Sequence, residues 1–373
     1  MTVEEDLASQ ILVVDDRPDE LRAVLLEFDP PLDPLHPNDL TVADLEGRTL
    51  VLVDFQLQDW KGADSADACV PRDGLALAAA IRSHLRGRPA AVALHAAKLE
   101  HLAGGRSAEA REHVVARAHN LEWAFTKSAG LRDQWEILAA AVARLPGVWT
   151  WEDDDEIRRF EALLALPEAD WVHAARSDLE ECRPPLHEVS EYTSGMALLR
   201  WLLHRVLPYP TFLRSAEYVA VALGVDPASF RAAVSASEER NRLVERIEAA
   251  RYKGILAGFL GDRWWKAGIE ALVWDLTSGR PFDRDALWSA LSELAPDLRR
   301  LSEVDPVLEL DERFVLTERI LEREETVELQ PDDWPLYAEA PAMGIARVQK
   351  HLERLLPVVV ELDRERVPAL DEE

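Results

Sequence analysis

Two apolar runs, each ending in aspartate, decide the fold of the first part of the chain. Gln10-Ile11-Leu12-Val13-Val14 leads into Asp15-Asp16, and Thr49-Leu50-Val51-Leu52-Val53 leads into Asp54. Neither run alternates apolar with polar residues, which is typical of parallel strands that are covered on both faces. Helical sequence follows the first run to about Phe28, so this stretch predicts a strand followed by a helix.

The same alternation continues through the first 145 residues. Further strands are predicted at 40–43, 90–94 and 121–125, the first of them weaker than the others, and a helix is predicted over 73–85. Together these segments predict an α/β fold with a doubly wound parallel sheet of five strands. Ligands of such sheets bind outside the carboxyl ends of the strands.

Charged side chains gather at those carboxyl ends. Asp15, Asp16 and Asp54 are expected at one edge of the sheet, and Lys127 follows the fifth strand. Converging carboxylates repel one another unless a hard cation lies among them, and Mg²⁺ takes carboxylate, water and phosphate oxygens as ligands. A lysine opposite supplies countercharge for a phosphoryl group. The residues therefore predict a Mg²⁺ site that can hold a phosphorylated aspartate, with Asp54 as the nucleophile.

Four segments, in this order, resemble the receiver domain of two-component response regulators over residues 9–145. Val13-Val14-Asp15-Asp16 is similar to the acidic pair of that family, and Leu52-Val53-Asp54 is similar to its phosphoacceptor segment. Asp73-Gly74-Leu75 resembles the turn that opens the next helix, and Phe125-Thr126-Lys127 resembles the lysine segment. The resemblance implies a flavodoxin-like receiver fold in a signalling protein.

The resemblance also implies a role for each residue of the site. Asp54 would accept a phosphoryl group from a histidine kinase, and Lys127 would contact the phosphoryl oxygens. Asp16 and Asp54 would ligate Mg²⁺ together with the backbone carbonyl of Gln56, while Asp15 would help through water.

Several positions depart from the family's pattern. His95-Ala96 follows the fourth predicted strand where the family has Ser or Thr and then a small residue, although a protonated imidazole there could pair with phosphate. Ala124 occupies the aromatic switch position, Ser128 replaces the usual proline, and the loop from Asp54 to Gly74 is longer than usual. Two interpretations stay open: an active phosphoacceptor, or a pseudo-receiver that works without phosphorylation as a docking or dimer surface.

The second part of the chain is predicted to be mainly α-helical. We expect a receiver-like domain over 1–147 and an output or effector domain over 148–373, with a short β segment at 305–346 where alternating residues are typical of exposed strands. The expected role of this domain is to meet a protein partner, and a homodimer through the receiver is a further arrangement that the sequence allows.

Two motifs in the second part suggest contacts with other molecules. Residues 214–236 resemble a helix-turn-helix, with Arg231 on the candidate recognition helix, but base readout favours Arg, Asn or Gln at the start of such a helix. Trp264 and Trp265 lie between basic residues, so they are either a stacking or partner contact or part of a core. A DNA-binding regulator is therefore an alternative function.

Composition limits the classes of protein that fit. The chain carries 42 Lys and Arg against 70 Asp and Glu, a net charge of −28, which argues against general binding to nucleic acid or to an anionic membrane. No apolar run reaches the ~18 residues of a membrane span. Two cysteines, Cys69 and Cys182, make no disulfide framework, so a cytoplasmic protein is expected. No nucleotide-binding or hydrolase motif occurs, so no enzymatic activity is predicted beyond phosphoacceptor chemistry.

Overall fold

The chain forms two compact units that interleave along the sequence. The computed structural model describes residues 8–26, 28–57, 73–85, 88–103, 110–127, 130–149, 156–185, 195–235 and 242–367. The first unit comprises Met1–Ala165, Pro184–His204 and Gly254–Leu260, and the second comprises Leu166–Arg183, Arg205–Lys253 and Gly261–Glu373. A single cut at residue 147 therefore does not separate the two units.

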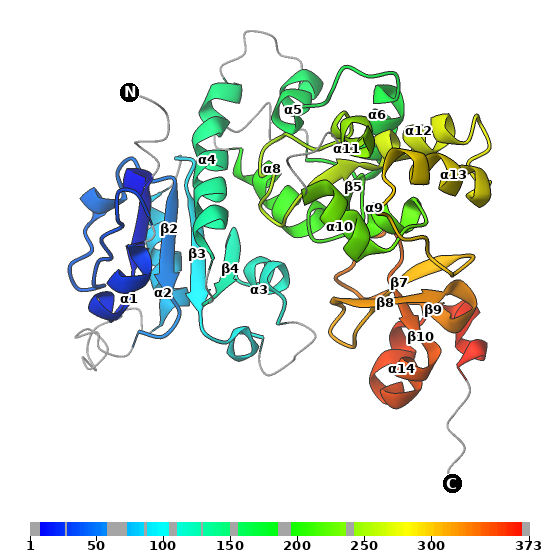
Figure 1. The fold of residues 1–373 in the computed structure, drawn as a ribbon. Coiled ribbons are helices and arrows are strands. Elements are labelled where there is room, and N and C mark those ends of the chain that lie inside the picture. The colour runs from blue at the N-terminus through cyan, green and yellow to red at the C-terminus, as the bar shows by residue number, and fades with distance from the viewer. Residues whose placement is uncertain are drawn as a thin grey trace. The chain divides into compact units, whose positions relative to one another are not determined.

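The first unit is built on a four-stranded parallel sheet (Figure 1). Its strands, in spatial order, are β1 (Ile11–Val14), β2 (Leu50–Asp54), β3 (Ala91–Ala96) and β4 (Trp123–Thr126). Every residue of β1, β2 and β3 is buried, as their unbroken apolar runs predict.

Helices cover both faces of this sheet. Four of them are α1 (Pro18–Leu25), α2 (Gly74–His84), α3 (Glu112–Ala118) and α4 (Arg132–Trp149). Leu77 of α2 and Val115 of α3 belong to one apolar cluster with Leu94 of β3. Trp135 of α4 instead contacts His95, the next residue of β3. Because successive side chains of a strand point to opposite faces, α4 covers the face opposite to α2 and α3.

The prediction of a strand at 40–43 is wrong. Residues Val42–Leu45 form a 3-10 helix instead, because Asp44 accepts hydrogen bonds from both the backbone N–H (2.8 Å) and the hydroxyl (2.7 Å) of Thr41. Beside β1, Leu35 makes a single parallel bridge, donating to the carbonyl of Val13 at 2.8 Å and accepting from the N–H of Asp15 at 3.0 Å. Among the described residues the sheet thus has four strands, not five.

Shorter helical segments complete the first unit and lead into the second. They are the 3-10 helices at Ala8–Gln10 and Leu99–His101, α5 (Glu156–Leu164), α8 (Met196–Trp201) and a π-helical turn at Leu202–Val206. No helix in the described ranges combines the length and the apolar character that crossing a membrane requires.

The second unit contains a helical core beside a two-stranded sheet. Its elements here are α6 (Val172–Glu181), β5 (Leu213–Ser215), α9 (Ala216–Ala222), α10 (Pro227–Ser235), α11 (Arg242–Glu248), β6 (Arg263–Trp265), α12 (Lys266–Leu276) and α13 (Arg284–Leu294). Phe230, Trp264 and Leu291 are buried together in its core. The antiparallel pair of β5 and β6 was not predicted, because each strand has only three residues.

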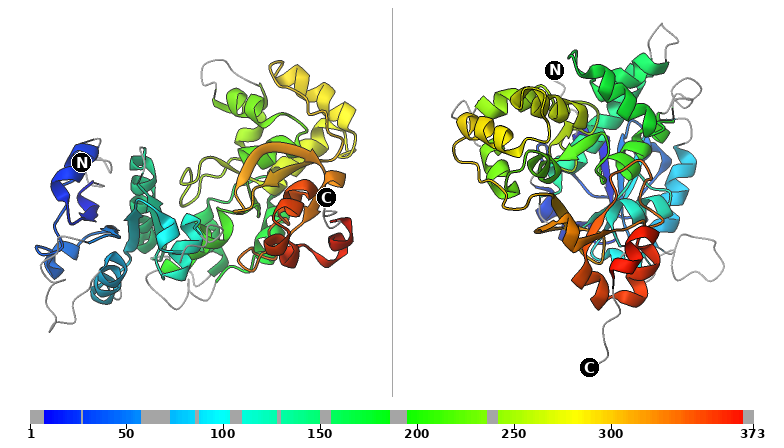
Figure 2. Two further views of the ribbon diagram at one scale, coloured as in Figure 1. Left: turned by 90° about the horizontal axis from the view of Figure 1, so that it is seen from below. Right: turned by 90° about the vertical axis from the view of Figure 1, so that its right-hand side faces the viewer.

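The C-terminal part of the second unit holds a four-stranded mixed sheet (Figure 2). Its strands are β7 (Pro306–Leu310), β8 (Leu316–Glu322), β9 (Thr326–Glu328) and β10 (Ala342–Gly344), in the order β8-β7-β10-β9. All four strands fall within 305–346, where the sequence predicts a β segment. The helical elements around them are the 3-10 turn Arg323–Glu325, α14 (Ile345–Lys350), α15 (Leu352–Leu355) and the 3-10 turns Leu356–Val358 and Glu361–Arg366.

Candidate metal centre

Three buried carboxylates meet at the carboxyl edge of the parallel sheet. Asp15 and Asp16 follow β1 directly, and Asp54 is the last residue of β2. Because β1 and β2 are parallel neighbours, their ends lie at one edge. The exposed fractions of these residues are only 4%, 5% and 7%, and one carboxylate oxygen from each lies within 4.8 Å of the others. The structure therefore brings together the three acids that the sequence predicts at this edge.

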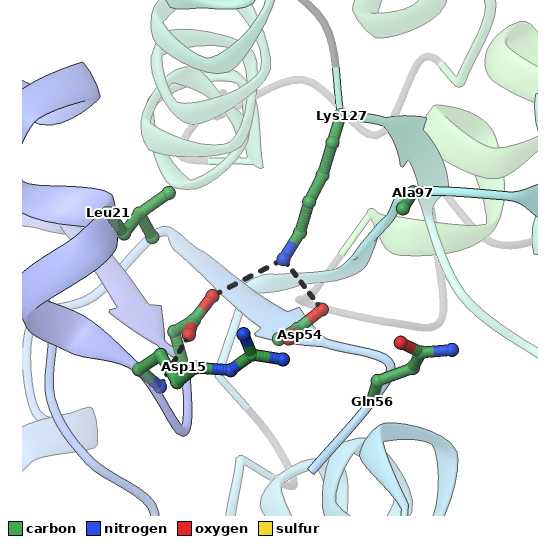
Figure 3. A pocket seen from close by; sticks show the side chains of 7 residues that line it. Asp15, Leu21, Asp54, Gln56, Ala97 and Lys127 are labelled. Atoms are coloured by element: carbon green, nitrogen blue, oxygen red, sulfur yellow. Dashed lines mark hydrogen bonds and ion pairs between the residues drawn. The ribbon is translucent and has the colours of Figure 1, made fainter. Parts of the chain in front are cut away.

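Lys127 reaches across to two of these acids. It follows β4, and its backbone N–H donates to the carbonyl of Ala96 at 2.8 Å, which fixes its position at the sheet edge. Its Nζ lies 3.0 Å from Oδ1 of Asp54 and 3.5 Å from Oδ2 of Asp15, as Figure 3 shows. A flexible ammonium group that bridges two carboxylates can also turn toward a third negative group placed between them.

Two of the acids, Asp15 and Asp54, line a hollow of about 250 Å³ together with Lys127. The lining residues are Asp15, Arg17, Leu21, Asp54, Gln56, Ala97 and Lys127. Sequence reasoning missed Arg17, although its place directly after the aspartate pair was a signal. The Arg17 backbone N–H donates to Oδ1 of Asp15 at 2.8 Å, so this turn orients the Asp15 carboxylate. Gln56, whose backbone carbonyl is the expected third ligand, also lines the hollow.

Gly74 allows the start of α2 to lie against the backbone of Asp54. A Cβ at position 74 would lie 2.1 Å from the Asp54 carbonyl oxygen, closer than any real contact. The Gly74 N–H donates to the carbonyl of Phe55 at 3.0 Å, and Asp73 caps the helix by accepting from the N–H of Ala76 at 2.8 Å. The Asp73-Gly74-Leu75 segment therefore packs against the end of β2, where Asp54 lies.

Three carboxylates lie close enough together at this edge of the sheet to repel one another. Burial raises the pKa of Asp54, Lys127 opposes that rise, and the charges of Asp15 and Asp16 add to it. A divalent cation would remove this repulsion, and three carboxylates supply only hard oxygen donors, which suit Mg²⁺, Ca²⁺ or Mn²⁺ better than metals that prefer sulfur or nitrogen. The donor set therefore fits the ion expected from the sequence.

His95 lies beside the site rather than in it. His95 is only 5% exposed. Its ring packs edge-on against Trp135, with ring centroids 5.3 Å apart. Among the described residues neither ring nitrogen has a hydrogen-bond partner. Burial, together with the nearby charge of Lys127, lowers the pKa of His95 to about 3. The imidazole is therefore neutral near pH 7, and the expected pairing of a protonated His95 with phosphate is not supported by this burial.

Trp135, which sequence reasoning missed, joins His95 to an aromatic cluster. Its ring stacks on Phe28 at 5.6 Å and lies edge-on to Phe125 at 6.1 Å, while Phe125 approaches Phe259 at 6.2 Å. The only signal in the sequence was a tryptophan in the first turns of α4. The Trp135 ring thus lies between His95 and the other aromatic side chains of this cluster.

The predicted contacts of the second part are engaged within the second unit. Nη1 of Arg231 lies 2.8 Å from Oε1 of Glu217. Trp264 and Trp265 are each 1% exposed, and Trp265 stacks on Phe212 at 5.4 Å. The two tryptophans are therefore core residues, and they do not present an aromatic surface for stacking or docking.

Some sequence features lie outside the described residues. They include most of the long loop after Asp54 (residues 58–72), which contains Cys69, and Ser128. The second cysteine, Cys182, is buried, and burial raises the pKa of its thiol to about 12. Cys182 is therefore an inert core residue.

Comparisons of this chain with protein families, with curated proteins and with solved structures found no match. The class of protein must therefore be inferred from the parallel sheet and the acidic hollow at its edge.

Proposed function

We propose that the first unit is a receiver-like phosphoacceptor domain of a response-regulator-like signalling protein. The observation that carries the proposal is the position of Lys127, whose Nζ lies 3.0 Å from Asp54 and 3.5 Å from Asp15 at the mouth of a buried acidic cluster. A structural ion pair needs one acid, whereas here Lys127 bridges two carboxylates of a cluster of three beside an open hollow. This arrangement suits a site that receives both a cation and an anion.

The cation in this proposal is Mg²⁺. Asp16 and Asp54 would ligate it with the backbone carbonyl of Gln56, and Asp15 would act through water. Mg²⁺ keeps several waters and binds through one or two carboxylates together with phosphate oxygens, which matches a hollow that is acidic but not closed by protein ligands. When bound, the ion would neutralise charge on the transferring phosphoryl group.

The reaction in this proposal is phosphoryl transfer to Asp54. A carboxylate oxygen of Asp54 forms the new bond to phosphorus while the bond from phosphorus to a nitrogen of the donor phosphohistidine breaks. The electron pair of that bond stays on the donor imidazole, and an acyl phosphate forms on Asp54. Lys127 would hold the phosphoryl oxygens during transfer, because its ammonium group already lies at Asp54. A histidine kinase is the expected donor.

The fold fits the proposal when the sheet is compared with the flavodoxin-like strand order 2-1-3-4-5. We interpret β1, β2, β3 and β4 as strands 1, 3, 4 and 5 of that order. The second strand of a doubly wound five-stranded sheet would then be reduced to the bridge at Leu35, which lies on the outer side of β1. The parallel order of all four strands supports this interpretation.

The output of the proposed domain would be a change in how the chain meets a protein partner. A phosphoryl dianion on Asp54 would draw Lys127 away from Asp15 and change the charge of this edge of the sheet. The helical part of the chain is the proposed contact for the partner, and a homodimer through the receiver-like unit is a second arrangement of the same kind.

A pseudo-receiver scaffold is the second candidate, and His95 favours it. The position where the family carries a hydroxyl is a neutral, buried imidazole that packs on Trp135. Such a residue cannot donate the hydroxyl hydrogen bond that the resemblance implies. In this case the acidic hollow would bind a cation without covalent chemistry.

Intact-protein mass spectrometry tests the proposal. The protein would be incubated with a small phosphodonor such as acetyl phosphate, with and without Mg²⁺, beside Asp54→Asn and the matched surface variant Asp39→Asn. We expect one added phosphoryl group on the wild type and on Asp39→Asn only when Mg²⁺ is present, and none on Asp54→Asn. A folded wild type that binds Mg²⁺ but gains no mass would overturn the phosphoacceptor and favour the scaffold.

A further inference from the structure

A second hollow, with the opposite charge, lies within the second unit. Its volume is about 260 Å³. The lining residues come from β5, α9, α12, the start of α13, β7, the 3-10 turn Arg323–Glu325 and the loop before β10. They are Arg214, Tyr218, Val219, Val221, Ala222, Lys266, Ile269, Glu270, Arg284, Pro306, Arg323 and Glu339. Segments more than a hundred residues apart in sequence therefore build one concave site.

Cations outnumber acids in this lining. Four basic side chains face two acidic ones, Glu270 and Glu339, in a chain whose net charge is −28. Three of the basic groups have acidic partners, and these pairs are Arg214 with Glu339 at 2.5 Å, Lys266 with Asp178 at 3.0 Å, and Arg323 with Asp305 at 2.8 Å. These three ion pairs form part of the walls of the hollow. The fourth basic residue has no acidic partner among the described residues.

That cation is Arg284, the first residue of α13. Among the residues that the structure describes, no hydrogen bond or ion pair is made by its guanidinium. The carboxylate of the neighbouring Asp283 is engaged elsewhere, because it caps α13 by accepting from the N–H of Ala286 at 2.9 Å and pairs with Arg280 at 2.8 Å. A half-buried arginine without a counterion lacks the interaction that usually accompanies such burial.

The turn between α9 and α10 makes room for Arg284. Gly224 has a φ of +69°, and a Cβ at this position would lie 2.9 Å from Nη1 of Arg284. The glycine therefore permits both the left-handed turn and the close approach of the guanidinium. The turn that resembles a helix-turn-helix in sequence thus accommodates an arginine that lines the hollow.

We infer that this hollow binds a small organic anion, with a phosphate or carboxylate group held by Arg284. The planar guanidinium presents paired N–H donors that match either group. Val221, Ile269 and Pro306 supply an apolar wall for the organic body of the ligand, as is usual in small-molecule sites. The small volume and the strongly negative chain favour a metabolite over a nucleic acid.

Isothermal titration calorimetry in low-salt chloride buffer without divalent cations tests this inference. The probes are inorganic phosphate, adenosine monophosphate and citrate, so that the phosphate and carboxylate sources are separated. The variant is Arg284→Ala, and the matched control is Arg313→Ala, whose side chain is 53% exposed and does not line the hollow. We expect at least one probe to bind the wild type and the control equally, and its affinity to fall at least about tenfold in Arg284→Ala, which corresponds to ~1.4 kcal/mol.

Two further variants keep the test decisive. Arg284→Lys retains the charge and replaces the variant if Arg284→Ala does not fold, and it should bind more weakly than the wild type because it loses the paired donors. Asp54→Asn should leave binding unchanged, so failure of the proposed phosphoacceptor would not affect this result. The inference is overturned if no probe binds at millimolar concentration, or if binding survives unchanged in both Arg284 variants.

Discussion

Two places in the first unit bury carboxylates in opposite ways. Glu122 is 0% exposed, and its carboxylate accepts hydrogen bonds from Arg82 at 2.7 Å, from Arg200 at 2.7 Å and from the backbone N–H of Val92 at 2.6 Å. The acidic cluster buries three aspartates, and Lys127 pairs with two of them, Asp15 and Asp54. Two arginines thus face the single carboxylate of Glu122, whereas Asp15 and Asp54 share a single lysine.

This difference indicates which buried charge serves structure and which serves a ligand. A compensated carboxylate holds elements together, and removing it leaves its partners buried without a counterion. An uncompensated cluster opposes folding until a cation arrives from solution. The hollow around Arg284 shows the same imbalance with the opposite sign. The predictions below test this contrast, beginning with the largest expected effect.

Removing the compensated carboxylate should cause the largest loss of stability. Glu122→Ala leaves the partly buried Arg82 and Arg200 without a shared acid and removes a fully buried carboxylate, so we expect the free energy of unfolding to fall by about 3 kcal/mol. Urea denaturation measures this change, and Glu100→Ala, at an exposed position, is the matched control. A loss below about 1 kcal/mol would mean that the network around Glu122 is not a structural centre.

Acidification should destabilise the same region through His204. This residue is 5% exposed, its Nε2–H donates to the carbonyl of Glu122 at 2.9 Å, and burial lowers its pKa from 6.5 to about 4. The unfolded chain therefore binds a proton that the folded chain excludes, so stability falls as the pH drops from 6.5 to about 4. The full effect is about 3 kcal/mol.

The variant His204→Gln separates this contribution, because glutamine keeps an N–H donor but does not titrate. Urea denaturation at several values of pH between 7 and 4 should show a shallower loss of stability in His204→Gln than in the wild type. The exposed-position variant His101→Gln should retain the wild-type slope. Equal slopes in all three proteins would show that another group controls the acid sensitivity.

The uncompensated acids should respond to a divalent cation with a smaller effect. At ten times its Kd, Mg²⁺ should stabilise the wild type by about 1.4 kcal/mol, seen as a higher melting temperature. Asp54→Asn should be more stable than the wild type without Mg²⁺, because burial and the neighbouring acids raise the pKa of Asp54 and so disfavour its charge. The same variant should gain less from Mg²⁺. An unstable Asp54→Asn protein would contradict the contrast with Glu122.

The sheet and the acidic hollow were largely predictable because their signals are local. An unbroken apolar run predicts a buried strand, and the residue after the run lies at the sheet edge, which places Asp15, Asp54 and Lys127 together. The strand predicted at 40–43 failed for an equally local reason. Its apolar residues are few, and the capping of Thr41 by Asp44 favours a helical turn.

Other features depend on contacts between distant segments and have no short signature. The neutral state of His95 follows from its burial against Trp135, forty residues later in the chain, which no spacing rule reveals. The lining of the Arg284 hollow runs from Arg214 to Glu339. Sequence reasoning did not connect the Gly224 turn with Arg284, because the approach of Arg284 to this turn is visible only in three dimensions.

The bridge at Leu35 has a consequence for how copies of this chain can associate. The backbone of Leu35 hydrogen-bonds to the outward-facing carbonyl of Val13 and to the outward-facing N–H of Asp15. Leu35 lies between Pro34 and Pro37, which have no backbone donor of their own. An open strand edge invites pairing with a second chain and aggregation, and short, proline-flanked edges suppress it. The sheet is thus blunted along β1, so a homodimer of this unit would not form by extending the sheet at this edge.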